Sequence, residues 1–191
     1  CPAGYAVISA DCRATNESEG EHFAHFDPQM CRDIHDMVEW IAEQDWCDGN
    51  VGMNGVSYLA ATQWMGASEN PPHLKAIIPW EGFNDFYREH VAHGGMPDTN
   101  FFREIWGRRM NSETGFIAKG ATVEDVVAEQ KARPLMDDYW RSKHPDLTKI
   151  TVPTYAVASW ATAGLHTRGS IEGFKQASSE EKWLYGHGRK E

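Results

Sequence analysis

A serine in a strand–turn–helix pattern is the first residue of this chain that could do chemistry. Residues 50–64 have the pattern of a short buried strand, a tight turn that presents Ser57, and a helix. A serine hydroxyl is a poor nucleophile, so it must stand clear of the sheet where a base can reach it. The turn also directs the backbone N–H of Tyr58 at a developing oxyanion, and Gly55 has no Cβ to crowd it. The pattern predicts a nucleophile at Ser57 and an oxyanion donor at Tyr58.

The turn departs from the general form of such an elbow, G-x-S-x-G. Leu59 stands at the fifth position, and a small residue, Ala60, follows one step later. A bare G-x-S also fits an ordinary serine in a turn. The remaining members of a serine hydrolase site therefore decide between the two interpretations, and they should follow in the order Ser, acid, His, each just beyond a strand.

A histidine near the end of the chain fits the base. His187 follows the strand-like segment 182–185 closely, and glycines flank it so that a substrate can approach. The other eight histidines lack this position, and a surface or structural role is the default interpretation for each of them. The acid is not assignable, because residues 159–165, which follow the fourth expected strand, contain no carboxylate.

Two groups of side chains could be drawn as zinc sites. The first joins a loop to a helix, and the second is a histidine pair; they are His22, His25, Cys31 and His35, and His90 with His93. Their spacing is irregular and matches no common ligand pattern. Solvated histidines are the favoured interpretation, and we expect no metal and no other cofactor.

The elements that must position these residues follow an α/β order. Apolar segments at 4–11, 50–56, 74–80, 152–160 and 182–185 are expected to be strands. Asp27 and Pro28 are typical of a helix start, and further helices are expected at 59–67 and 167–177. Alternation of strand and helix implies a mainly parallel sheet with right-handed crossovers. Ser57 falls at the C-terminal end of a strand, where sites on such sheets lie.

Residues 81–150 have a different character, because aromatic and charged side chains are mixed there. Thr-Val-Glu-Asp at 122–125 resembles a capping box before a short helix. We interpret the segment as a helical insertion over the sheet, with ordinary surface helices as the alternative. The chain then divides into a first core part (1–80), the insertion (81–150) and a second core part (151–191).

Composition limits the class of protein. The 191 residues, 41% of them hydrophobic, are enough for one domain with a sizeable core. A formal charge of −10 without a basic run argues against a nucleic-acid partner, and no apolar run is long enough to span a membrane. The four scattered cysteines, Cys1, Cys12, Cys31 and Cys47, are expected to be reduced thiols, which predicts a cytoplasmic protein. A homo-oligomer stays open.

Several blocks of the chain, in the same order, resemble the cocaine esterase and X-prolyl dipeptidyl aminopeptidase family of α/β-hydrolases (CocE/NonD-type acyl esterases). They lie at residues 4–7, 11–13, 18–20, 39–41, 44–46, 49–53, 55–59, 63–64, 71–77 and 166–169. The family's elbow reads Gly-x-Ser-Tyr-x-Gly, so the small residue expected after the serine falls at Ala60. The resemblance covers nearly all of the chain outside the insertion.

The resemblance implies an α/β-hydrolase core with a helical cap at residues 81–150. It implies that Ser57 is the nucleophile of an acyl-enzyme mechanism, His187 the base and the Tyr58 N–H one oxyanion donor. It also implies that the chain is a fragment. The first strands and a second oxyanion donor would lie upstream of it, and a C-terminal jelly-roll domain would follow it. Two motifs depart from the family: its Gly-x-Gly is Ala14-x-Asn16 here, and Thr162 stands where its acid is expected.

We therefore expect a serine esterase acting on a small-molecule ester or a short peptide, and two alternatives remain. An X-prolyl dipeptidyl peptidase would need a carboxylate for the substrate amino terminus; Glu81, Asp85 and Glu89 are candidates, although exposed helix-face charges are their default interpretation. A catalytically weak or inactive hydrolase-like binding module is favoured by Thr162, because loss of the acid can cost a triad about 10⁴ in rate.

Overall fold

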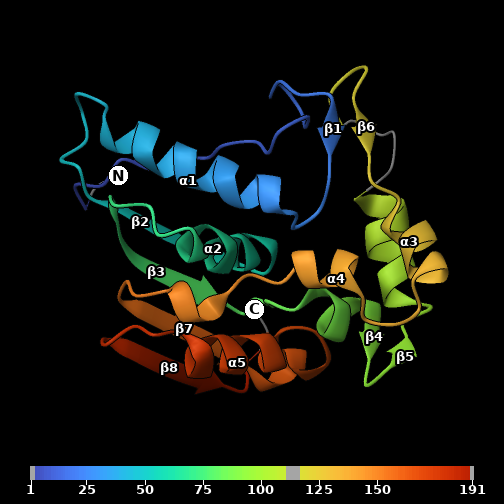
Figure 1. Cartoon of the computed structure of the whole chain (residues 1–191). Helices are drawn as coiled ribbons and strands as arrows, with labels where there is room; N and C mark the ends of the chain where they lie inside the picture. Colours follow the sequence, from blue (N-terminus) through green and yellow to red (C-terminus); the bar gives the residue numbers. More distant parts are fainter. Residues whose placement is uncertain (1–2, 111–116, 190–191) are drawn as a thin grey trace.

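A four-stranded parallel sheet forms the centre of the protein. The structure, a computed structural model, describes residues 3–110 and 117–189 (Figure 1). The strands lie in the order β2 (Val51–Val56), β3 (Leu74–Trp80), β7 (Thr154–Ser159) and β8 (Lys182–His187). Each pairs in parallel with its neighbour, so the α/β fold class and four of the expected strands are confirmed.

Three helices pack on one face of this sheet. They are α1 (Pro28–Ala42), α2 (Tyr58–Ser68) and α5 (Arg168–Gln176). Asp27 caps α1 as expected, because its Oδ1 accepts the N–H of Met30 at 2.8 Å. The strand order never reverses, so right-handed crossovers bring α2 and α5 to the same side. The core beneath them consists of Val38, Ile41, Val51, Trp64, Ala67, Leu74, Ile77, Leu147, Ile150, Ala156 and Ala177.

Apolar side chains remain exposed on the sheet as well. Neighbouring side chains alternate between the two faces of a strand, and the helices cover one face only (Figure 1). The exposed set is Val56, Ile78, Trp80, Tyr155, Trp183 and Tyr185, each of which is at least 37% exposed.

The strand expected at residues 4–11 does not form. This segment has no regular secondary structure, and Tyr5 and Val7 are 73% and 79% exposed. A parallel strand is stabilised by a ladder of hydrogen bonds to a neighbour. Among the described residues β2 pairs only with β3, and no strand pairs with residues 4–11. The apolar run therefore predicted a buried strand that the structure lacks.

Residues 81–150, the segment expected to be an insertion, contain several short helices within their described part. These are π-helical η1 (Tyr87–Val91) and η2 (Arg103–Arg109), α3 (Val126–Ala132), α4 (Asp138–Ser142) and 3₁₀-helical η3 (Leu147–Lys149). Two-residue strands accompany them: β4 (Ala92–His93) pairs with β5 (Met96–Pro97), and β6 (Thr122–Val123) pairs with β1 (His22–Phe23). The helix expected after Thr122 begins later, because Asp125 is its N-cap.

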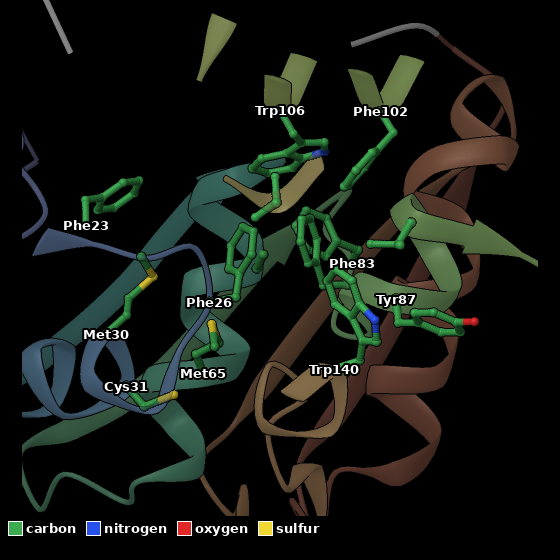
Figure 2. Packing of buried hydrophobic residues seen from close by; sticks show 14 of the residues in the cluster. Phe23, Phe26, Met30, Cys31, Met65, Phe83, Tyr87, Phe102, Trp106 and Trp140 are labelled. Carbon is green, nitrogen blue, oxygen red and sulfur yellow. The ribbon is translucent and has the colours of Figure 1, made fainter. Parts of the chain in front are cut away.

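An aromatic cluster joins the insertion to the core (Figure 2). Phe26, which precedes α1, packs at ring-centroid distances of 4.8 Å from Phe83 and 5.6 Å from Trp106. Phe86 lies 4.9 Å from Trp106 in an edge-to-face arrangement, which such rings prefer. All four rings are at most 3% exposed. The insertion is therefore held to the core by buried rings.

The described cysteines Cys12, Cys31 and Cys47 are free thiols, and Cys1 lies outside the described residues. Burial raises the pKa of the Cys31 thiol to about 12, which keeps it protonated. Within residues 3–110 and 117–189 no helix has the length and apolar character needed to cross a bilayer.

Candidate active site

The turn between β2 and α2 has the geometry of a nucleophile elbow. Ser57 adopts φ 59° and ψ −112°, a conformation that is costly for a residue with a side chain. Gly55 permits the turn, since a Cβ there would lie 2.5 Å from the Cβ of Leu59. The Ser57 N–H donates to the Trp80 carbonyl at 3.1 Å, which fixes the turn to the end of β3. The strain is concentrated at the residue expected to be the nucleophile.

The small residue at position 60 has a packing reason. Ala60 is fully buried, and Gly82 lies directly against it. A Cβ on Gly82 would approach the Ala60 Cβ to 2.5 Å. A larger side chain at either position would separate α2 from the chain that leaves β3, and the elbow would move with it.

Tyr58 points its side chain away from the elbow and into the aromatic cluster. Its ring lies 4.6 Å from Phe26 and 6.1 Å from Trp106, and burial raises the pKa of its phenol. Its backbone N–H stands in the first turn of α2, where helical N–H groups have no acceptor within the helix. Hydrogen bonding within α2 therefore leaves that N–H available to an acceptor outside the helix.

His166 is the imidazole that contacts the nucleophile. Its Nε2 lies 3.0 Å from the Ser57 Oγ. His166 belongs to a π-helical segment, η5 (Ala163–Thr167), between the 3₁₀ turn η4 (Trp160–Thr162) after β7 and the helix α5. Burial lowers the pKa of His166 to about 4, although the charge of Glu81 acts in the opposite direction. A neutral imidazole at this distance can accept the serine proton.

His187, the base expected from the sequence, has Glu81 as its charged neighbour. It ends β8, whereas Ser57 follows β2, so β3 and β7 lie between them. The His187 Nε2 stands 3.1 Å from the Glu81 Oε1, in an orientation that does not complete a hydrogen bond. The structure therefore brings Ser57 together with His166 and brings His187 together with Glu81.

Glu81 is a fully buried carboxylate at the C-terminal end of β3. Its Oε1 faces His187 and the Trp80 Nε1 (3.4 Å), and its Oε2 accepts from the Thr162 Oγ1 at 3.0 Å. Its backbone has φ 52° and donates to the Val157 carbonyl at 2.8 Å. Thr162, at the position expected for the acid, thus holds a carboxylate from the neighbouring strand.

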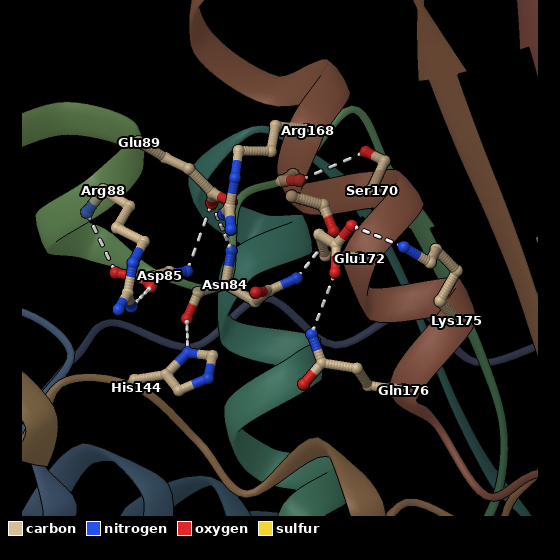
Figure 3. A network of polar contacts seen from close by, with 12 residues as sticks. Asn84, Asp85, Arg88, Glu89, His144, Arg168, Ser170, Glu172, Lys175 and Gln176 are labelled. Carbon is tan, nitrogen blue, oxygen red and sulfur yellow. Dashed lines mark hydrogen bonds and ion pairs between the residues drawn. The ribbon is translucent and has the colours of Figure 1, made fainter. Parts of the chain in front are cut away.

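A buried polar network fixes the segment that follows His166 (Figure 3). Glu89 accepts the backbone N–H groups of Asn84 (2.9 Å) and Asp85 (3.1 Å) and forms an ion pair with Arg168 at 2.5 Å. The Asn84 Nδ2 donates to the Gly169 carbonyl at 2.6 Å. Burial raises the pKa of Glu89 to about 7, against these hydrogen bonds and the Arg168 charge. The network ties the insertion to the start of α5.

The three acidic residues considered for binding a substrate amine are not exposed. Glu81, Asp85 and Glu89 are at most 3% exposed, and each already has charged or hydrogen-bonding partners. Asp85 pairs with Arg88 at 2.5 Å. The expectation that these three carboxylates are exposed charges on helix faces was therefore wrong.

The histidine groups drawn as zinc sites do not assemble into one. Over the described ranges, no three or more His, Cys, Asp or Glu side chains are placed to hold a metal ion. The His90 Nδ1 instead accepts from the Trp106 Nε1 at 3.2 Å, and the His22 Nδ1 contacts the Thr122 Oγ1 at 2.8 Å.

A cavity of about 290 Å³ is lined by Arg13, Phe23, Met30 and Asp33 among others, beside α1 rather than at Ser57.

Sequence reasoning missed His166 and the arrangement of Glu81. His166 lies within a block that matches the family, residues 166–169, and four residues after Thr162. That position is the signal in the sequence that could have identified His166 as a candidate site residue. Glu81 was considered only as a substrate ligand, because its contacts to Thr162 and His187 span 81 and 106 positions in the sequence.

Comparison with known proteins places the chain in a family. A family model described as X-Pro dipeptidyl-peptidase (S15 family) matches residues 1–189. Cocaine esterase of Rhodococcus sp. (strain MB1 Bresler) is 51% identical over 147 residues, which are 70% of this chain and 25% of that protein. Xaa-Pro dipeptidyl-peptidase of Lactobacillus delbrueckii subsp. lactis is 31% identical over 111 residues, 52% of this chain and 14% of that protein.

Solved structures agree on the fold. A CocE/NonD family hydrolase from Staphylococcus aureus superposes with a TM-score of 0.83 at 49% identity, covering 94% of this chain and 31% of that one. An α-amino acid ester hydrolase at 17% identity shares the fold with a TM-score of 0.67, over 92% of this chain and 36% of that one. The fold is thus that of the α/β-hydrolases, and the chain spans a quarter of the length of the cocaine esterase.

Proposed function

Because this chain belongs to the X-Pro dipeptidyl-peptidase (S15) family, we propose that it carries the nucleophile of a serine hydrolase that cleaves esters. Ser57 would attack the ester carbonyl, a histidine would take the hydroxyl proton and return it to the leaving alcohol, and water would release the acyl group. The observation that carries the proposal is the 3.0 Å contact between the Ser57 Oγ and the His166 Nε2 at a strained elbow.

The geometry favours His166 over His187 as the proton acceptor. A general base must lie within about 2.6–3.2 Å of the proton donor, and His166 meets this condition. His187, the base inferred from the sequence, stays in the proposal as the partner of Glu81. The Tyr58 N–H is proposed as one oxyanion donor.

Ester cleavage is favoured over X-prolyl dipeptide release. An aminopeptidase of that type needs a free carboxylate for the substrate amino terminus. Glu81, Asp85 and Glu89 are all buried and already paired, so none of them is available without breaking an internal contact. One relative named as an esterase is also more similar to this chain than the one named as a dipeptidyl-peptidase.

We also propose that residues 81–150 form the cap that bounds the acyl pocket. We further propose that the protein is cytoplasmic. Support for the cap is the packing of Trp106 at 6.1 Å from Tyr58, the residue after the nucleophile. The three free thiols support the location, because thiols stay reduced in the cytoplasm.

Active-site labelling tests the proposal. The full-length protein is treated with a fluorophosphonate, and the modified peptide is mapped by mass spectrometry. Ser57→Ala is compared with Ser178→Ala, which changes an exposed serine just after the C-terminal end of α5. We expect labelling at Ser57 that is lost only in Ser57→Ala. An aryl ester and an X-prolyl amide are then compared as substrates. A folded protein that is not labelled would support the binding-module alternative, and faster cleavage of the amide would support the peptidase.

A further inference from the structure

The hydrolase site has a buried carboxylate whose role the proposed mechanism has not used. Ends of neighbouring parallel strands share one edge of the sheet, and four polar residues stand at or shortly after the strand ends there: Ser57, Glu81, Thr162 and His187. Glu81 lies between the nucleophile strand and the strand that leads to Thr162. A histidine base needs a negative charge in this region, because it becomes an imidazolium when it takes the serine proton.

Resting on the proposed function, we propose that Glu81 is the positioning acid of the site and that Thr162 holds it in place. Both carboxylate oxygens have polar neighbours: Oε1 accepts from the Trp80 Nε1 at 3.4 Å and stands 3.1 Å from the His187 Nε2 without a hydrogen bond, and Oε2 accepts from the Thr162 Oγ1 at 3.0 Å. An isolated buried carboxylate is strongly disfavoured, so a fully buried one is retained where partners compensate it.

The backbone at Glu81 supports a functional role. Its φ of 52° is unusual for a residue with a long side chain, and such strain persists only where the surroundings impose it. Gly82 follows, pressed against Ala60 on the elbow helix, and the Glu81 N–H is fixed to β7 at 2.8 Å. The carboxylate therefore stands at a set distance from the elbow.

The same contacts account for the threonine at the acid position. A hydroxyl at 162 donates to the neighbouring Glu81, whereas a carboxylate there would place two like charges about 3 Å apart and oppose ionisation of one of them. Thr162 thus supports the acid and does not supply it. In the reaction Glu81 forms no bond to substrate. It lies beside His187, and its negative charge favours the protonated form of His166 while Ser57 attacks and while the proton returns to the leaving alcohol.

Moving the carboxylate from position 81 to position 162 tests the proposed role of Glu81. In the full-length protein, Glu81→Gln should lower kcat for an aryl ester by about 10²–10⁴ with little change in KM. It should also move the acid limb of kcat/KM to lower pH, since a cation loses its counter-charge. Adding Thr162→Asp to that variant restores a carboxylate on the adjacent strand end and should recover at least about tenfold of kcat. Glu172→Gln on α5 is the matched control for a change of carboxylate to amide.

A second pair of variants tests the proposal even if the Glu81→Gln protein does not fold. Thr162→Val removes the hydroxyl and keeps Glu81, and Thr162→Ser keeps a hydroxyl; we expect the serine variant to exceed the valine variant by about tenfold in kcat. A Glu81→Gln enzyme with unchanged kcat, or one that is folded but neither shifts its acid limb nor responds to Thr162→Asp, would overturn the role of Glu81 alone. A wild-type protein without Ser57 labelling would overturn the proposed function as well.

Discussion

Acidification is the perturbation that tests the His166 assignment most directly. Burial lowers the pKa of this imidazole to about 4 from its ordinary value of 6.5. The acid limb of kcat/KM reports the base of the free enzyme. If His166 takes the Ser57 proton, activity should persist down to about pH 4 and then fall with protonation of the ring.

The same pKa predicts a loss of stability on acidification. Between pH 6.5 and about 4 the unfolded chain binds a proton at His166 that the folded protein does not. Stability therefore decreases as pH falls through this window, because the unfolded state holds more protons there. The fall from 6.5 to about 4 corresponds to about 3 kcal/mol at pH 4 relative to neutral pH.

Two variants and two assays separate the histidines. Hydrolysis of an aryl ester is followed at a wavelength where the leaving group absorbs equally in both protonation states, and urea unfolding is measured at pH 4 and pH 7. His166→Asn should lower kcat by about 10²–10⁴ and remove the His166 part of the pH-dependent stability, and His187→Asn is the matched comparison. An acid limb at pH 6–7 that His187→Asn abolishes, with normal activity in His166→Asn, would refute the reasoning.

Two further predictions concern packing around the site. Glu89→Ala leaves two backbone N–H groups and Arg168 without their acceptor, so it should destabilise the protein by about 2–4 kcal/mol in urea unfolding; Glu172→Ala, at a more exposed pair, should cost under about 0.5 kcal/mol, and equal losses would contradict the role of the network. Gly173→Ala places a Cβ 2.6 Å from the buried Trp64 ring and should cost about 1–3 kcal/mol. Gly164→Ala, with nothing within 4 Å, is its control, and a stable Gly173→Ala protein would show that Trp64 can shift.

Local signals predicted much of the fold. Asp27 and Pro28 mark the start of α1 correctly because a cap depends on residues three positions apart. The elbow at Ser57 is similarly local, since Gly55 meets Leu59 within the same turn. The run at 4–11 failed because hydrophobicity reports burial preference and cannot supply the neighbouring strand that a ladder requires.

The members of the site were harder to predict because they meet only in three dimensions. His166 contacts Ser57 although 109 positions separate them in the sequence, and it lies in a π-helical segment that no periodic pattern predicts. π-Helical turns are rare and often occur at functional sites. They have no sequence pattern comparable to that of an α-helix, so a structure is needed to locate them. Glu81 was visible as a residue, but its two partners were not.

The network at Glu89 has a consequence for how substrate entry and proton transfer are linked. Glu89 belongs to the insertion, while Arg168 begins the helix directly after the segment that carries His166. The Asn84 side chain adds a second tie to the Gly169 carbonyl. A displacement of the insertion that admits a substrate must therefore either strain this connection or carry the His166 imidazole with it. Under the proposed mechanism, movement of the cap at residues 81–150 and alignment of the His166 base are therefore coupled.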